Sequence, residues 1–242
     1  MTFAANAAPG APVPDWRPPP FPPRATIDGR YVRLEPLDPA RHADDLFDAF
    51  AEDAEGRNWT YRLQEPFPTR TALRAWLDAI SVRRDPQYYA YVDKQSGRAL
   101  GNGALMSVAP QAGSIEVGSI MFAPRLQGTR AATEAMALKM ARVFELGYRR
   151  YEWTCDPLND ASVRAALRLG FRHEATFRQA YVTKGRNRDK AVFSILDSEW
   201  PALRSAFETW LAAENFDAGG RQRARLSALT ADALGSDGGN AS

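Results

Sequence analysis

A short polar loop, residues 124–130, has the composition of an anion-binding turn. It reads Pro-Arg-Leu-Gln-Gly-Thr-Arg and joins an apolar stretch, Ser114–Phe122, to a helical pattern that runs from Gly128 to Leu146. The first backbone N–H groups of a helix have no intrahelical partner, and the helix dipole adds partial positive charge there. A glycine lets the backbone approach a ligand closely. The loop is therefore predicted to bind an anion such as a phosphate group.

A second polar cluster follows the next predicted strand, Tyr151–Cys155. Asn159-Asp-Ala-Ser162 opens a helical pattern that ends at Leu169-Gly-Phe171. Asn159 and Ser162 have the spacing of a helix N-cap and the third helical residue. Cys155 ends the strand nearby, and a lone cysteine of this kind is interpreted as a packing residue rather than a nucleophile.

Glu116 is the one charged residue of the strand Ser114–Phe122. Alternation along a strand predicts that two sets of side chains face opposite ways, Glu116, Gly118, Ile120 and Phe122 against Ile115, Val117 and Met121. A lone carboxylate in an apolar strand is either a general base or a structural residue in an ion pair. The sequence leaves both interpretations open.

The composition is that of an ordinary globular protein. Of the 242 residues 45% are hydrophobic and 25% are charged, and no run approaches the roughly 18 apolar residues that a membrane span needs. A net charge of +2 gives no reason to expect a nucleic-acid or membrane partner. Arginine supplies 27 of the 31 basic residues, which fits either a GC-rich genome or a set of arginine clamps for phosphate.

The few cysteines and histidines argue against a disulfide and a metal site. One cysteine allows no internal disulfide, and two distant histidines, His42 and His173, form no metal-ligand motif, so no metal is expected. The first residues lack the basic and apolar regions of a signal peptide. A cytoplasmic location is therefore expected.

Composition divides the chain into three parts. Residues 1–25 are rich in alanine and proline and are predicted to be an arm on or near the domain. Residues 26–217 have the patterns of one α+β domain, and residues 218–242, rich in Gly, Ser, Ala and Arg, are predicted to be a flexible tail. Strands are expected over 29–36, 88–92, 99–108, 114–122, 151–155, 175–183 and 190–196, and helices over 39–52, 69–83, 128–146, 159–169 and 198–215.

The order of these elements and motifs resembles the GNAT N-acyltransferases, in the Rim-type branch typified by ribosomal-protein N-terminal acetyltransferases. The resemblance covers about residues 26–217 and implies an α/β/α fold, with a mixed, mostly antiparallel sheet of about seven strands and flanking helices. The motifs that carry it are Glu116-Val-Gly118, Pro124–Ala135, Leu146–Arg150, Asn159-x-x-Ser162, Leu169-Gly-Phe171 and Lys184–Asp189. The family's loop reads Arg/Gln-x-x-Gly-x-Gly/Ala; here Arg130 replaces the second small residue, and its side chain could reach the pyrophosphate or the 3′-phosphate of CoA.

The resemblance implies acetyl-CoA as the co-substrate. Amides of the polar loop would bind the pyrophosphate, and the pantetheine arm would pair with the strand 114–122 like an added strand. Asn159 would hydrogen-bond the pantetheine or only cap its helix. The implied CoA-binding residues are Ile120, Met121, Phe122, Arg125, Gln127, Gly128, Thr129, Arg130, Ala131 and Asn159.

The resemblance also implies direct attack of an amine on the acetyl thioester in a ternary complex. Glu116 would remove the amine proton through water, and Ser162 would protonate the departing thiolate. Trp59, Tyr61 and Phe67 lie between the first two predicted helices, where family members form the acceptor pocket. Plain packing under a loop is the open alternative for these aromatic residues.

The expected protein is thus an acetyl-CoA-dependent N-acetyltransferase for a primary amine, either a protein or peptide N-terminus or a small amine, that works as a monomer or homodimer. One alternative is an enzyme for another acceptor, such as an aminoacylated or antibiotic amine. The other is a non-catalytic acyl-CoA-binding or interaction module on the same fold. The presence of Glu116, Asn159 and Ser162 favours an enzyme.

Overall fold

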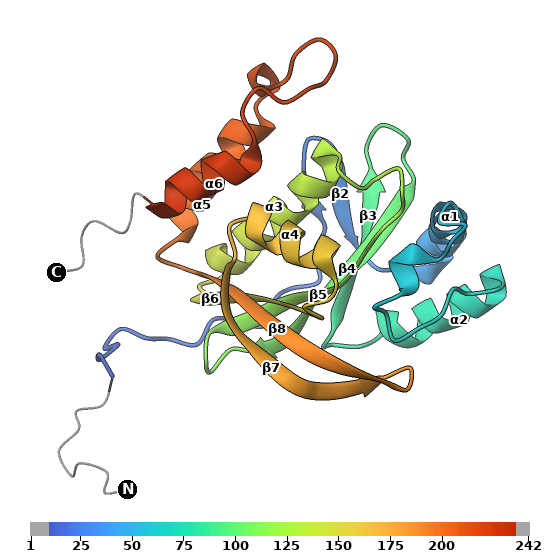
Figure 1. Cartoon of the computed structure of the whole chain (residues 1–242), viewed down its shortest axis with the longest axis horizontal. Helices are drawn as coiled ribbons and strands as arrows, with labels where there is room; N and C mark the ends of the chain where they lie inside the picture. The colour runs from blue at the N-terminus through green and yellow to red at the C-terminus, as the bar shows by residue number, and fades with distance from the viewer. Residues whose placement is uncertain (1–9, 236–242) are drawn as a thin grey trace, which may run out of the picture.

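An eight-stranded mixed sheet forms the centre of the molecule (Figure 1), in the computed structural model that describes residues 10–235. The strand order is β1-β2-β3-β4-β5-β6-β8-β7, and only β5 and β6 are parallel neighbours. The predicted mixed sheet is confirmed, with eight strands rather than about seven because the two-residue β1 was not foreseen. The strands are β1 (Ile27–Asp28), β2 (Val32–Pro36), β3 (Gln87–Asp93), β4 (Ala99–Ala109), β5 (Ser114–Phe122), β6 (Arg150–Cys155), β7 (Arg172–Thr183) and β8 (Arg186–Leu196).

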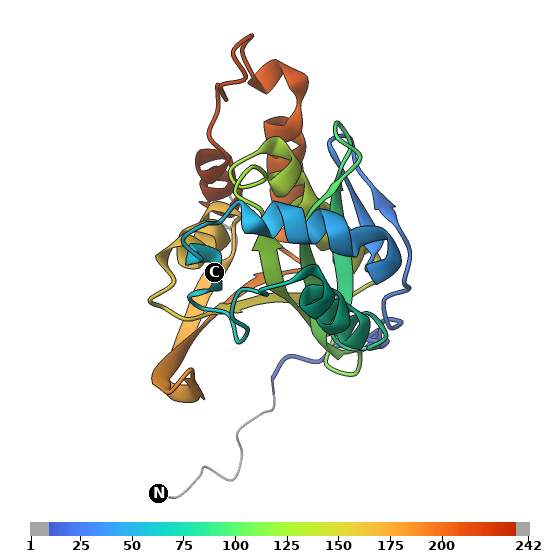
Figure 2. The same ribbon diagram turned by 90° about the vertical axis from the view of Figure 1, so that its right-hand side faces the viewer.

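Helices cover both faces of this sheet (Figure 2). On one face α1 and α2 bury a cluster around Leu46, Leu77 and Tyr88. On the other face α3, α4 and α5 bury a larger cluster around Met140, Tyr151 and Phe207. The helices are α1 (Pro39–Ala51), η1 (Arg57–Trp59), α2 (Arg70–Ser81), α3 (Arg130–Glu145), α4 (Asp160–Arg168), α5 (Trp200–Leu211), η2 (Ala213–Asn215) and α6 (Leu226–Gly235). None of those in the described part of the chain has the length and apolarity to cross a membrane.

Polar side chains fix where the site-forming helices begin. Thr129 Oγ1 accepts the Ala132 N–H at the start of α3, and Asn159 Oδ1 accepts the Ser162 N–H at the start of α4. Each bond satisfies one of the amides that a helix leaves unpaired, an effect typically worth about 1 kcal/mol. The caps therefore set the position of both N-termini relative to the sheet.

A buried carboxylate fastens α3 to the edge of the sheet. Glu134 accepts hydrogen bonds from the backbone N–H groups of Arg30, Tyr31 and Val32, at 2.8, 2.6 and 3.0 Å. These donors lie in the turn between β1 and β2 and at the first residue of β2, so one side chain satisfies three backbone groups at once. The turn and the first half of α3 are held together by this contact.

The proline-rich segment before residue 26 runs over the domain from residue 10 onward. Tyr148 and Tyr89 donate hydroxyl hydrogen bonds to the carbonyls of Pro20 and Pro23, at 3.2 and 3.3 Å. The Arg149 guanidinium lies 5.7 Å from the ring centre of Trp16. These are contacts of an extended arm on a folded surface; residues 1–9 of the predicted arm lie outside the described residues.

The flexible tail expected over residues 218–242 needs correction. Helix α6 lies within that range and packs beside α5 (Figure 1), with Leu226 buried. Apolar residues at 226, 229, 233 and 234 supply the packing face, which the small and polar composition of the segment concealed. The last seven residues of the expected tail lie outside the described residues, and the predicted domain limits stay a prediction.

Lys139 is a fully buried cation between α3 and the sheet. Its Nζ donates to the Tyr91 hydroxyl at 2.7 Å and lies 4.9 Å from the centre of the Tyr91 ring. Because burial penalises the charged form, the pKa of Lys139 falls to about 7. The core thus contains an amine that is partly neutral near pH 7.

We expect Lys139→Met to flatten the pH dependence of stability. Between pH 7 and the unfolded lysine pKa of about 10.4, the unfolded chain binds a proton that the native chain lacks, so the contribution of Lys139 to stability rises with pH across that window. Below the window both states are protonated and the contribution is constant. Urea unfolding at pH 7, 8 and 9 measures this pH dependence. Lys190→Met, the same substitution on strand β8, is the control. Parallel curves for wild type and Lys139→Met would contradict the expectation.

Candidate functional site

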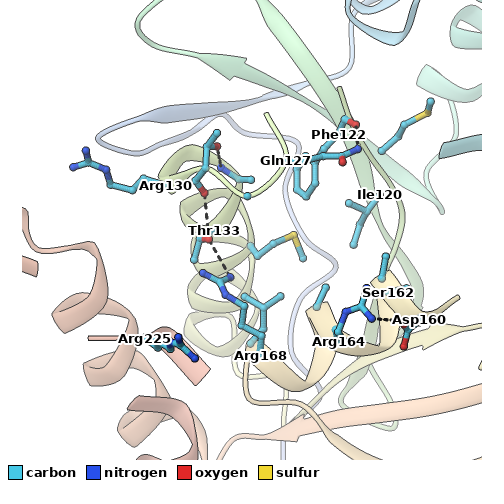
Figure 3. A pocket seen from close by; sticks show the side chains of 18 of the residues that line it. Ile120, Phe122, Gln127, Arg130, Thr133, Asp160, Ser162, Arg164, Arg168 and Arg225 are labelled. Atoms are coloured by element: carbon cyan, nitrogen blue, oxygen red, sulfur yellow. Dashed lines mark hydrogen bonds and ion pairs between the residues drawn. The ribbon is translucent and has the colours of Figure 1, made fainter. Parts of the chain in front are cut away.

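The parallel strands β5 and β6 separate after four pairs, and a cavity opens where they part. Pairing runs from Ser114 with Arg150 to Val117 with Trp153, after which β5 stays on β4 and β6 stays on β8. A cavity of about 1630 Å³ lies in and beyond the gap. Its walls include the end of β5, Trp153 of β6, and the N-terminal turns of α3 and α4 (Figure 3).

Side chains from η1, from the segment after it and from the loop before α3 satisfy the β5 backbone along this gap. Arg62 Nη1 donates to the Ile120 carbonyl at 3.3 Å. Asn58 Nδ2 and Gln127 Nε2 donate to the Phe122 carbonyl at 3.4 and 3.1 Å. Burial lowers the pKa of Arg62. The carbonyls of Ile120 and Phe122, in the strand predicted to pair with pantetheine, thus already accept side-chain hydrogen bonds.

A β-bulge at Ser119 corrects the predicted faces of β5. Ala104 pairs with Gly118 and Asn102 pairs with Met121, so β5 has one residue more than β4 over this stretch, and Ser119 has a φ of 51°. The alternation therefore reverses, and Met121 shares a face with Glu116 and Gly118. Ile120 and Phe122 pack instead against the cluster under α3 and line the cavity. The predicted grouping of Glu116 with Ile120 and Phe122 is wrong because of this extra residue.

The N-terminus of α3 faces the cavity with unpaired amides. Gly128 has a φ of 71° and lines the cavity together with Thr129 and Arg130. No hydrogen-bond acceptor contacts the backbone N–H of Gly128, Arg130 or Ala131 within residues 10–235. Unpaired amides at the positive end of a 16-residue helix are suited to a phosphate group.

The other residues predicted around this loop are placed differently. Gln127 and Arg130 line the cavity, whereas Ala131 is buried in the core beneath the helix. Arg125 points elsewhere and forms an ion pair with Glu52 at 2.9 Å. The Arg130 guanidinium lies 4.1 Å from the centre of the Phe216 ring, and its Nη1 is 3.4 Å from the Tyr31 hydroxyl.

Ser162 lines the cavity at the start of α4. Its hydroxyl oxygen accepts the indole N–H of Trp153 at 3.0 Å, and the hydroxyl also forms a hydrogen bond with the Cys155 thiol. Asn159, the N-cap, lines the cavity too. Cys155 is buried, and burial raises the pKa of its thiol. A thiol with a raised pKa is a poor nucleophile, so the packing interpretation of Cys155 fits its surroundings.

Glu116 lies at the point where the two strands part, outside the cavity wall. Its carboxylate accepts from Thr154 Oγ1 at 2.7 Å and from Ser107 Oγ at 3.1 Å. Thr154 is the first β6 residue beyond the last β5–β6 pair. The buried carboxylate has hydroxyl partners rather than a cation within the described residues, so the ion-pair interpretation does not describe it.

The three predicted aromatic residues are not brought together. Tyr61 lines the cavity, and its hydroxyl donates to the Leu158 carbonyl at 2.7 Å. Trp59 and Phe67 instead pack edge to face, 5.7 Å between ring centres, in the core beneath α1 and α2. Plain packing therefore describes Trp59 and Phe67, and only Tyr61 reaches the site.

The arginines at the far end of the cavity were not predicted from the sequence. Arg168 of α4 reaches Thr133 of α3 at 3.2 Å, and burial lowers its pKa. The segment between η2 and α6 forms the opposite wall, with Arg221, Arg223 and Arg225. Their spacing, Arg-x-Arg-x-Arg, was a visible signal, because alternate residues of an extended segment face one way.

Comparisons with known proteins agree with this geometry. A family model described as an acetyltransferase (GNAT) domain matches residues 32–172, more than half of the chain. The sequence matches no curated protein. Among solved structures, a GCN5-related N-acetyltransferase from Brucella melitensis is 48% identical, with a TM-score of 0.89 over 90% of this chain and 100% of that one.

Two further solved structures are less similar to this chain, and they differ in sequence identity. A probable acetyltransferase of the GNAT family from Chromobacterium violaceum is 43% identical, with a TM-score of 0.75 over 82% of this chain and 100% of that one. RimL, a ribosomal L7/L12 α-N-protein acetyltransferase, is 16% identical, with a TM-score of 0.61 over 71% of this chain and 94% of that one. At that identity the likeness extends to the fold alone.

We expect Gly128→Glu to weaken binding of acetyl-CoA. A Cβ at Gly128 meets no atom within 4 Å, so the substitution brings backbone strain from the φ of 71° but no clash at Cβ, and it places a carboxylate at the amides of α3. Like charges about 4 Å apart near a protein surface repel by roughly 4 kcal/mol at an effective dielectric constant of 20, so a loss of at least about tenfold in affinity is expected. Isothermal calorimetry measures it.

Gly97→Glu is the matched control for this variant. Gly97 has the same φ of 71°, is equally open, and lies in the turn between β3 and β4, outside the cavity wall. It carries the same backbone strain and the same charge, and its affinity for acetyl-CoA should be that of wild type. Unchanged affinity in a folded Gly128→Glu protein would show that the α3 loop does not bind the phosphates.

Proposed function

This chain belongs to the GNAT acetyltransferase family, and we propose that it transfers the acetyl group of acetyl-CoA to a primary amine. The acceptor is a protein or peptide N-terminus or a small amine, and attack is direct, within a ternary complex. The observation that carries the proposal is the cavity itself, which joins a gap between two parted strands to a helix N-terminus with unpaired amides.

The cavity fits an acyl-CoA at both ends. The α3 amides and the arginines around them are suited to phosphate groups, because phosphates bind strongly to helix N-termini and to guanidinium groups. The gap beside Ile120 and Phe122 exposes a strand edge and leads to Ser162. Pantetheine is a narrow chain with two amides, so a strand edge is a suitable surface for it. Gly128, Thr129 and Arg130 would hold the pyrophosphate, with Ile120, Phe122 and Asn159 along the arm.

Glu116 and Ser162 stand on opposite faces of the sheet at the same point along β5 and β6. Glu116 bonds Thr154 on the α1 and α2 side, and Ser162 bonds Trp153 on the α3 and α4 side. Thr154 and Trp153 are neighbours where the strands part. A thioester in the gap would therefore have a carboxylate on the face from which an amine arrives and a hydroxyl on the face from which the thiol leaves.

The transfer forms a C–N bond and breaks a C–S bond. The amine nitrogen gives up a proton, for which Glu116 is the acceptor through a water molecule, and the departing sulfur gains one, for which Ser162 is the donor. The indole N–H of Trp153 donates to the Ser162 oxygen and so positions its hydroxyl at the cavity wall. The two side chains thus divide the proton transfers between them.

The Rim-type branch, and with it a peptide N-terminus as acceptor, rests on the motifs in the sequence. Tyr61 is the aromatic residue that would contact the acceptor, because it alone of the three predicted ones lines the cavity. The β7–β8 hairpin fixes this segment through Arg188 Nη1, which donates to the Tyr61 carbonyl at 3.3 Å. The hairpin and the segment after η1 together would form the acceptor side.

A thiol-release assay with acetyl-CoA and a panel of peptides and small amines tests the proposal. Release that depends on an amine, with mass spectrometry of the acetylated product, is the expected result. The competing function is a non-catalytic acyl-CoA-binding module on the same fold. Binding of acetyl-CoA without release for any amine would favour that module.

We expect Glu116→Gln to lower kcat/KM by about 10²–10⁴-fold, the usual contribution of a general base. The loss should be greatest at low pH, where the amine is charged and its proton must be removed. Affinity for acetyl-CoA should stay as in wild type. The matched control is Glu152→Gln. Glu152 lies opposite Glu116 on β6, and its carboxylate binds Arg150. Wild-type activity across the pH range in Glu116→Gln would make Glu116 structural.

We expect Ser162→Ala to lower kcat by about ten- to a hundredfold, at or below the usual contribution of a general acid. The loss is limited because thiols ionise near pH 8.5, so the thiolate leaves without full protonation. The Asn159 cap remains, because it bonds the backbone of residue 162. Ser205→Ala on α5 is the control. If urea unfolding shows a loss of stability while kcat of the folded protein is unchanged, Ser162 only supports Trp153.

A further inference from the structure

The wall formed by residues 216–225 supplies the cavity with arginines that have no carboxylate partner among residues 10–235. Seven arginines line the cavity, and Asp160 is the one acidic residue among its lining. Asp160 is paired with Arg164, and Arg57 is paired with Glu55. The remaining guanidinium groups form no ion pair within the described residues; they are Arg130, Arg168, Arg221, Arg223 and Arg225.

The segment that carries three of these arginines is held in a fixed shape. The buried Asn215 side chain donates to the carbonyls of Trp210 and Ala224 and accepts the Ala224 N–H, at 3.0, 3.2 and 2.8 Å. Phe216 and Gln222 form a β-bridge, and Gln222 accepts the Trp210 indole N–H at 2.8 Å. A segment with this many internal bonds keeps its arginines in place before a ligand arrives.

Two cation–aromatic contacts join α3 and α4 to this wall and to α5 beside it. Arg130 of α3 lies over the Phe216 ring, and Arg168 of α4 lies 5.1 Å from the centre of the Trp210 ring. Figure 3 shows Arg130, Arg168 and Arg225 around one hollow, from α3, α4 and the C-terminal segment. Five arginines from three elements therefore line this cavity.

We propose that residues 216–225 form a subsite for the 3′-phosphate of CoA, so that this chain selects 3′-phosphorylated CoA over its dephosphorylated form. The inference rests on the proposed function, because it takes CoA as the ligand. A pyrophosphate at the α3 amides accounts for about two negative charges, and a phosphate monoester adds about −1.5 to −2 near pH 7. The segment lies outside residues 32–172, which match the family model.

The arginines of this segment have the form that a phosphate monoester requires. A guanidinium group offers parallel N–H donors that match phosphate oxygens two at a time. Arg221, Arg223 and Arg225 alternate with Gln222 and Ala224, and all three line the cavity. The ring faces of Phe216 in the segment and of Trp210 on the neighbouring α5 already hold guanidinium groups, so this wall is suited to phosphate rather than to stacking with adenine.

Calorimetry with CoA and 3′-dephospho-CoA tests the subsite, in wild type and in the triple variant Arg221→Gln, Arg223→Gln, Arg225→Gln. Wild type should bind CoA at least about tenfold more tightly, as expected for hydrogen bonds between charged groups. The triple variant should lose most of this preference while its affinity for 3′-dephospho-CoA changes little. The control is Arg74→Gln, Arg178→Gln, Arg186→Gln, which removes three exposed charges outside the cavity wall and should keep the preference.

The outcomes separate the subsite from the proposed function. Equal affinity of wild type for both ligands would overturn the subsite and leave the acetyltransferase proposal standing. An equal loss for both ligands in the triple variant would also overturn it, because the arginines would then act on the pyrophosphate or through net charge. Failure of wild type to bind either ligand would overturn the proposed function together with the subsite.

Discussion

The early end of pairing between β5 and β6 is the constraint on which the rest of the site depends. Strand backbone must find hydrogen-bond partners, and two strands that part leave a row of carbonyls and amides between them. The bulge at Ser119 turns Ile120 and Phe122 toward that gap, and the side chains of Asn58, Arg62 and Gln127 satisfy the β5 carbonyls there. Without the parting of the strands there would be no edge to bind a ligand and no common point for Glu116 and Ser162.

Charged groups are distributed unevenly along the cavity. The far end collects the positive end of α3 and five arginines that form no ion pair among the described residues, whereas Arg57 and Arg164 elsewhere in the lining are each paired with a carboxylate. Charges at such a surface attract a polyanion over about 8 to 10 Å at ordinary salt concentrations. A ligand with an anionic end and a neutral arm is therefore oriented on entry, with its neutral arm toward Ser162.

Much of this architecture was accessible from the sequence, because local signals controlled it. The caps Thr129 and Asn159, the left-handed Gly128 and the helices they open all follow from residue types at fixed spacing. The faces of β5 did not follow, since one extra residue reverses the alternation and Ser119 gives no local sign of it. Trp59 and Phe67 were predicted to line the site because of their position in the chain, but their large rings are buried in the core. Helix α6 was missed because its composition is small and polar outside four apolar residues.

The hydrogen bonds across the gap limit what pairing with the strand can contribute to affinity. The carbonyls of Ile120 and Phe122 already accept bonds from Arg62, Asn58 and Gln127, so a ligand amide that pairs with them replaces one bond by another. The net value of such an exchange is at most about 1 kcal/mol. Binding strength must then come mainly from the charged end, where unpaired amides and arginines gain partners that they lack within the described chain. The strand edge sets the position of the reactive group, and the two positive walls hold the molecule that carries it.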